Sequence, residues 1–241
     1  MSLAGYLKRV VPRNVAGAIK SAFPSRYPYH CPICGLYTDS FITFGDPPRA
    51  QAACYGCLAL ERHRLLGLFV GAHPDRLTGR LLHFAPEASI ARLFRSRHIR
   101  AITTDLGSDR AQLLSDITRL PFPAGTFDSI YCSHVLEHVV DDGQAMRECA
   151  RVLRPGAYAV FQVPIRGDET YEDWSIDSPA ERTAHFGQHD HVRYFGRDIA
   201  ARFQAAGFDV TEYSPATLTA GRRHQVVAQG FTEPIWVCRR A

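Results

Sequence analysis

The chain has 241 residues, enough for one α/β domain with a small appendage, and its hydrophobic content of 46% is ordinary for a globular protein. It has no apolar run of about 18 residues and no secretory signal pattern, so we expect a cytoplasmic protein without stable membrane insertion. The formal net charge of +4 is too small to establish a polyanionic partner such as RNA.

Residues 1–30 begin with a basic amphipathic pattern. Leu3, Tyr6, Leu7, Val10 and Val11 recur at the spacing of one helix face. Such a segment can lie on a membrane surface. Packing on its own domain, or on a second copy in a homodimer, is the more common arrangement and the one we expect.

Two Cys-x-x-Cys pairs lie in residues 31–58, a region with few apolar residues. Cys31 and Cys34 form the first pair and Cys54 and Cys57 the second, with 19 residues between them. Four thiolates on two tight turns are a ligand set of structural zinc, and the metal then supplies the folding energy that so little apolar surface cannot. A redox dithiol is the alternative, but two matched pairs favour zinc in a reducing compartment.

From residue 59 onward, helical patterns alternate with short apolar strands. We expect helices over residues 58–69, 89–97 and 199–206 and around Ala145, Cys149 and Val152, with strands over 81–84, 99–104, 112–116, 127–132 and 158–163. Pro155-Gly156 is expected to end the helix before the fifth strand. Residues 208–213 and 226–237 are expected to close the sheet as an antiparallel edge pair. This order predicts an α/β fold with a doubly wound, Rossmann-like, seven-stranded sheet, whose ligands bind at the carboxyl ends of the strands.

Residues 116–165 carry a family resemblance. They include Asp-Ile-Thr-Arg-Leu-Pro-Phe, then Thr-Phe-Asp-Ser-Ile-Tyr-Cys-Ser-His-Val-Leu-Glu-His-Val, then Arg-Val-Leu-Arg-Pro-Gly. This order of loop acid, buried strand, polar strand end, helix and turn resembles the class I S-adenosylmethionine-dependent methyltransferases of type 11. The resemblance covers roughly residues 78–213, and the cysteine region is similar to zinc ribbons fused to some members. It implies a methyltransferase domain over residues 59–241 that binds S-adenosylmethionine.

The resemblance also implies a cofactor site at the ends of the first, second and fourth strands. Asp105 would bind the ribose hydroxyls, and Asp116 would accept from the adenine amine while Ile117 covers the ring. The usual glycine-rich loop is absent, and Glu87 in its place either meets the cofactor's α-ammonium group or complements the helix dipole. The predicted cofactor-binding residues are Phe84, Ala85, Pro86, Glu87, Asp105, Leu106, Asp116, Ile117, Ser133 and His134.

A polar stretch after the fifth strand, residues 169–193, is the expected acceptor region. A loop of this length is typical of a functional segment, and its aromatic residues argue against disorder. The predicted catalytic residues are His134, His189 and His191, with His189 or His134 removing the acceptor proton. The alternatives are that the histidines only anchor the loop, or that three of them bind a second metal.

Three functions are compatible with these residues. The first is a methyltransferase acting on an O or N atom of a small molecule, with a structural zinc ribbon. The second is an RNA methyltransferase that uses the ribbon and the basic N-terminus to grip phosphates. The third is a non-enzymatic zinc module on a degenerate methyltransferase body. The mild charge weighs against the second, and intact Asp105 and Asp116 weigh against the third.

Overall fold

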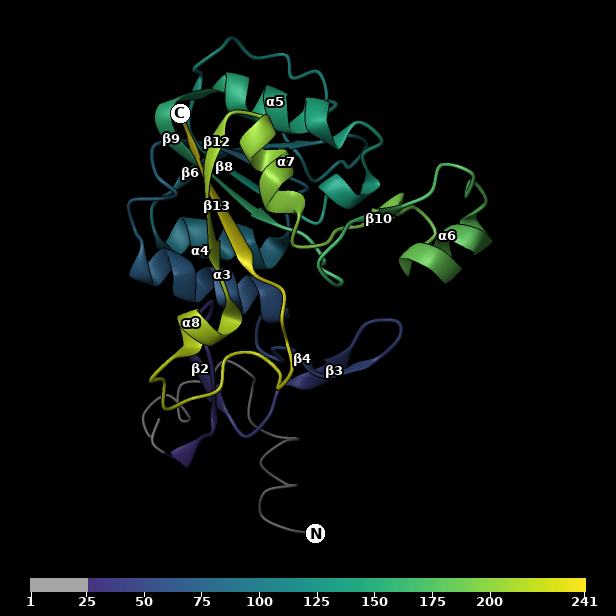
Figure 1. Cartoon of the computed structure of the whole chain (residues 1–241). Coiled ribbons are helices and arrows are strands. Elements are labelled where there is room, and N and C mark those ends of the chain that lie inside the picture. The colour runs from purple at the N-terminus through teal and green to yellow at the C-terminus, as the bar shows by residue number, and fades with distance from the viewer. Residues whose placement is uncertain (1–25) are drawn as a thin grey trace.

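The computed structural model describes residues 26–241, so most of the predicted amphipathic segment lies outside the described residues. A seven-stranded sheet stands between two layers of helices, and two small hairpins lie beyond one of these layers (Figure 1). Among the helices of residues 26–241, none is long and apolar enough to cross a membrane.

The sheet has the strand order β12-β13-β9-β8-β5-β6-β7. Its parallel part consists of β5 (Arg80–Phe84), β6 (Arg100–Asp105), β7 (Leu113–Leu114), β8 (Phe127–Ser133) and β9 (Leu153–Gln162). The strand β13 (Ile235–Arg240) runs antiparallel to both β9 and the edge strand β12 (Phe208–Tyr213). The predicted doubly wound seven-stranded sheet is therefore confirmed.

The two faces of the sheet are covered by different helices (Figure 1). On one face lie α3 (Glu61–Ala72) and α4 (Ala88–Ser96), and on the other lie α5 (Asp142–Val152) and α7 (Ile199–Ala205). Consecutive strand residues alternate between the two cores: Leu81 packs in the cluster of α3 and α4, and Leu82 in the cluster of α5 and α7. Burial on both faces explains why the strands read as almost continuous apolar runs.

The helix before β9 ends earlier than its proline suggests. Leu153 already has extended backbone angles, with φ −72° and ψ 149°, so α5 stops at Val152. The predicted stop, Pro155-Gly156, lies inside β9, where the register against β8 shifts and Gly156 takes φ +75°. The pair thus coincides with the irregularity in the strand, and the helix ends three residues before the proline.

The last strand is also shorter than predicted. It begins at Ile235 and not at residue 226. Val226 is buried, but its carbonyl accepts a hydrogen bond from the Arg64 side chain and not from a neighbouring strand. A buried valine in a loop gave the same apolar signal as the start of a strand.

The polar stretch after β9 is not one loop. It contains β10 (Tyr171–Glu172), α6 (Pro179–Phe186) and β11 (Arg193–Tyr194), and α8 (Pro215–Thr219) follows β12. Ser178 caps α6 by accepting from the Glu181 backbone, and Gly187 ends it in a left-handed conformation. Figure 1 shows α6 projecting from the body of the protein.

The cysteine region forms two antiparallel hairpins, one of β1 (Tyr29–Cys31) and β2 (Leu36–Thr38), the other of β3 (Ile42–Phe44) and β4 (Arg49–Ala53). Its apolar residues Ile33 and Phe41 belong to the same buried cluster as Leu65 and Phe69 of α3. The boundary at residue 58 stays a prediction, but the two parts share one core.

Arg64 of α3 ties the hairpins to the rest of the chain. Its side chain is fully buried, and its Nη1 donates to the carbonyls of Ala52 and Ala59 at 2.8 and 2.6 Å. Its Nε donates to Val226 at 2.5 Å, and Nη2 donates to Gln51 at 3.1 Å. One guanidinium therefore satisfies carbonyls from the hairpins, the entry to α3 and the C-terminal segment.

We expect Arg64→Met to destabilise the protein by at least about 3 kcal/mol, because each buried carbonyl left unpaired costs about 1–3 kcal/mol. Urea denaturation followed by circular dichroism measures the difference. Arg92→Met, at an exposed position on α4, is the matched control and should change stability little. Equal midpoints for Arg64→Met and the control would show that these four contacts do not hold the parts together.

Candidate functional site

Two adjoining cavities open at the carboxyl ends of the parallel strands. The first, of about 490 Å³, lies over β5, β6 and β8. The second, of about 820 Å³, lies between the hairpin of β3 and β4, the start of α3, the end of α6 and the C-terminal segment. His134 and His138 line both cavities, so the two spaces meet at the end of β8.

Most of the predicted cofactor-binding residues gather around the first cavity. Pro86, Glu87 and Ser133 are not part of its lining. The predicted residues that do line it are Phe84, Ala85, Asp105, Leu106, Asp116, Ile117 and His134. Their binding roles stay predictions.

Two carboxylates at this cavity are held by their own loops. Asp105 Oδ1 accepts from the backbone N–H groups of Gly107 and Ser108, both at 2.9 Å. Asp116 Oδ1 accepts from both the backbone N–H and the hydroxyl of Thr118 at 2.8 Å. In each case the turn uses one oxygen and orients the carboxylate, which leaves the second oxygen for a ligand.

Strained backbone marks two strand ends at the first cavity. Ala85 after β5 has φ +47° and His134 after β8 has φ +53°, a region that non-glycine residues seldom occupy. The strain costs of the order of 1–3 kcal/mol at each residue and tends to occur at ligand sites.

Glu87 is held from α3. Its carboxylate lies 2.8 Å from Nη2 of Arg62 and 2.6 Å from Nε2 of His63. The Leu60 N–H donates to Nδ1 of His63, so the ring donates to Glu87 through Nε2. Burial alone would raise the pKa of Glu87, but the His63 hydrogen bond and the Arg62 charge outweigh it and lower the pKa to about 2. The carboxylate thus links the loop after β5 to α3.

His134 lies between two carboxylates. Its Nδ1 is 3.1 Å from Glu137 Oε1, and its Nε2 is 3.0 Å from Glu233 Oε1. Burial would lower its pKa, but the two carboxylates raise the pKa to about 9. The ring is therefore cationic near neutral pH, hydrogen-bonded to Glu233 and ion-paired with Glu137, which disfavours the predicted role as a base. Nothing in the sequence pointed to Glu233, which is 99 residues away.

The other two predicted catalytic histidines differ in position. The side chain of His189 is 74% exposed and lines neither cavity, so the geometry gives its predicted role no support. His191 is buried and lines the second cavity, and its Nδ1 lies 3.0 Å from the Phe186 carbonyl.

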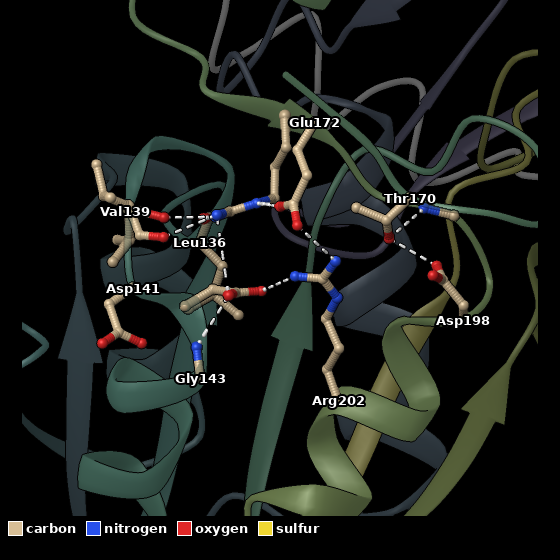
Figure 2. A network of polar contacts seen from close by, with 12 residues as sticks. Leu136, Val139, Asp141, Gly143, Thr170, Glu172, Asp198 and Arg202 are labelled. Carbon is tan, nitrogen blue, oxygen red and sulfur yellow. Dashed lines mark hydrogen bonds and ion pairs between the residues drawn. The ribbon is translucent and has the colours of Figure 1, made fainter. Parts of the chain in front are cut away.

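The turn that carries Glu137 and His138, η2 (Leu136–His138), is held by a buried arginine. Arg193 of β11 donates to the carbonyls of Leu136, Val139 and Val140, and its Nε donates to Glu172 at 2.8 Å. Glu172 also accepts a hydrogen bond from Arg202 of α7, at 3.1 Å (Figure 2). The network fixes η2 against the segment after β9 and so fixes the border between the cavities.

The strand order and the ligand-sized cavity at the carboxyl ends of the strands define a class I S-adenosylmethionine-dependent methyltransferase fold. Residues 78–161 match the family model described as "Methyltransferase domain", so this part of the chain is similar to that family.

The comparisons with individual proteins agree with this assignment. A demethylmenaquinone methyltransferase of Mycolicibacterium gilvum is 35% identical over 112 residues, 40% of this chain and 49% of the relative. A ubiquinone biosynthesis O-methyltransferase of Aromatoleum aromaticum is 30% identical over 101 residues, 39% of this chain and 43% of the relative. The chain thus spans about half the length of the curated relatives that it matches.

Solved structures share the fold at low identity. A putative sarcosine dimethylglycine methyltransferase from Galdieria sulphuraria has a TM-score of 0.55 at 13% identity, covering 75% of this chain and 85% of the other. A SAM-dependent methyltransferase from Archaeoglobus fulgidus has a TM-score of 0.53 at 12% identity, covering 74% and 94%.

We expect Glu87→Gln to lower the melting temperature near neutral pH, because Arg62 and His63 lose a charged partner. The folded-state pKa of Glu87 is about 2, against an ordinary value of 4.5. Its stabilising effect is therefore complete above about pH 5 and is lost as the pH falls through 4.5 towards 2. The gap between wild type and variant should narrow from pH 7 to pH 4 in thermal scans. Glu169→Gln, at an exposed position, is the control. A gap that is absent or independent of pH would contradict the ion pair.

Proposed function

We propose that this protein is an S-adenosylmethionine-dependent methyltransferase that methylates an O or N atom of a small molecule. The observation that carries the proposal is the pair of cavities that meet at His134 and His138. Methyl transfer requires two ligands side by side, with the acceptor atom in line with the methyl group. One cavity at the strand ends and one directly beyond it provide this arrangement.

The first cavity suits the cofactor. Asp105 at the end of β6 has a free oxygen for the ribose hydroxyls, and Asp116 has one for the adenine amine, with Ile117 alongside. Leu106 is 77% exposed and lines the cavity, so an apolar ring would cover it. When bound, S-adenosylmethionine supplies a methyl group that its sulfonium already activates. The task left to the chain is to bind, to orient and to exclude water.

The second cavity suits a small acceptor. Its volume of about 820 Å³ lies within the usual range for small-molecule sites, about 300–1,000 Å³. Asp46 and Arg49 from the β3–β4 hairpin line it together with Glu61 and Arg62 of α3. The hairpin would therefore form one wall of the acceptor site. Two of the relatives are named demethylmenaquinone methyltransferase and ubiquinone biosynthesis O-methyltransferase, which agrees with a small acceptor in preference to RNA.

We also propose that the cysteine cluster binds one structural zinc ion. The Sγ atoms of Cys31 and Cys57 are 3.7 Å apart, and those of Cys34 and Cys54 are 3.8 Å apart. Tetrahedral zinc with Zn–S bonds of about 2.3 Å places its thiolates about 3.8 Å apart. All four ligand atoms lie within 4.8 Å of one another, so the donor set and its spacing both fit.

We expect Asp105→Asn to weaken binding of S-adenosylhomocysteine by about 10- to 100-fold, because hydrogen bonds to a charged group contribute about 1.5–3 kcal/mol. Asparagine keeps the oxygen that accepts from Gly107 and Ser108, so the turn survives. Isothermal titration calorimetry measures the affinity, and Asp109→Asn, exposed on the same loop, is the matched control. Wild-type protein that fails to bind, or two variants that bind alike, would refute the cofactor site.

Cys57→Ser should lower the zinc content by one equivalent per chain in elemental analysis. It should also lower the melting temperature of the whole protein, because the hairpins and α3 share a core. Cys149→Ala, at a buried cysteine outside the cluster, should keep the zinc. The same zinc content in both variants would mean that the cluster is not a zinc site.

A further inference from the structure

Three side chains converge on the wall between the two cavities. Glu137 and His138 come from η2, and His191 comes from the segment after α6. One ligand atom of each lies within 4.8 Å of the others, a spacing from which three groups can hold a metal ion. Both histidines line the second cavity.

Glu137 brings to this place a buried carboxylate oxygen without a hydrogen-bond partner in the described part of the chain. Its side chain is 1% exposed, and Oε1 faces Nδ1 of His134 at 3.1 Å. The other oxygen, Oε2, is buried and has no hydrogen-bond partner among residues 26–241. A buried carboxylate oxygen without a donor is costly, so a cation at Oε2 would remove a substantial penalty.

His191 presents a lone pair to the same place. Its Nδ1 lies 3.0 Å from the Phe186 carbonyl, which can only accept, so Nδ1 carries the proton. The other nitrogen, Nε2, is then an acceptor, and it is buried without a partner among the described residues. A histidine whose N–H is fixed on a carbonyl while its second nitrogen stays free has the usual arrangement of a metal ligand.

His138 has a comparable arrangement. Its Nδ1 lies 3.3 Å from Oδ2 of Asp190, which leaves Nε2 for a ligand. A carboxylate behind a histidine ring raises the basicity of the ring and holds its orientation at metal sites. All three groups therefore have a second contact that orients them.

We propose that Glu137, His138 and His191 bind a divalent transition-metal ion, separate from the cysteine cluster. Two imidazoles and one carboxylate suit zinc or a neighbouring first-row ion, and three protein ligands leave at least one position open. Both histidines line the acceptor cavity, so an ion held there would have an oxygen atom of the acceptor within reach. The metal site is inferred only from the positions of the three side chains. Its contact with the acceptor depends, in addition, on the proposed function.

The test is calorimetric titration of Zn²⁺ into full-length protein whose cysteine cluster is already loaded with zinc. Wild type should take up one further equivalent. His138→Gln and His191→Gln should each weaken this binding by more than about tenfold, because a ligand is lost. His189→Gln, at the exposed neighbouring histidine, is the matched control and should bind like wild type.

No further equivalent in wild type, or wild-type affinity in both ligand variants, would overturn the proposal. His138 is about one-third exposed, so His138→Gln decides the matter if His191→Gln does not fold. Binding of S-adenosylhomocysteine by the same wild-type sample separates the two ideas. If S-adenosylhomocysteine does not bind, the proposed function is wrong. The result of the zinc titration alone decides whether the metal site exists.

Discussion

The buried guanidinium of Arg193 is the contact on which the geometry of both cavities depends. The turn η2 has only three residues, too few to hold its own shape through internal hydrogen bonds. Arg193 donates hydrogen bonds to three carbonyls, from this turn and from the chain just after it. Glu172 balances the charge of the guanidinium. Glu172 in turn binds Arg202 of α7, so the turn is fixed to a helix on the face of the sheet. Residues at the border of the cavities are positioned by this network and not by regular structure of their own.

Arg64 has the corresponding role on the other side of the molecule. Since it bonds carbonyls of both the hairpin region and the C-terminal segment, it sets the distance between two walls of the second cavity. Arg49 of the hairpin and Glu233 of the C-terminal segment both line that cavity. The cysteine hairpins therefore form part of the proposed acceptor site, and a change in their packing would change its shape.

The sequence predicted the sheet well and the contacts between its loops poorly. Strands such as β5 and β8 are buried on both faces, so their apolar runs were visible without any partner. The family resemblance assigned Asp105 and Asp116 to one site, and the edge at which parallel strands end is the usual place for such a site. Other contacts join segments that no local sequence pattern connects. Examples are the ion pair of His134 with Glu233 and the ion pairs of Glu87 with Arg62 and His63. In a sequence, buried arginines such as Arg64 and Arg193 cannot be told from surface arginines. They can be buried because carbonyls from distant parts of the chain accept their hydrogen bonds.

The loop after β5 shows how a missing motif changes recognition. A glycine-rich loop offers several backbone N–H groups and turns without strain, whereas Pro86 has no N–H and Ala85 holds φ +47° at a cost. The loop N–H of Ala85 donates to the Thr104 carbonyl, so it is not available to a ligand. In the proposed cofactor site, fewer backbone donors would therefore remain for the ligand, and more of the binding would come from side chains. Asp105 and Asp116, each with one oxygen fixed by its own turn, are preorganised for that work, because their orientation is set before any ligand arrives.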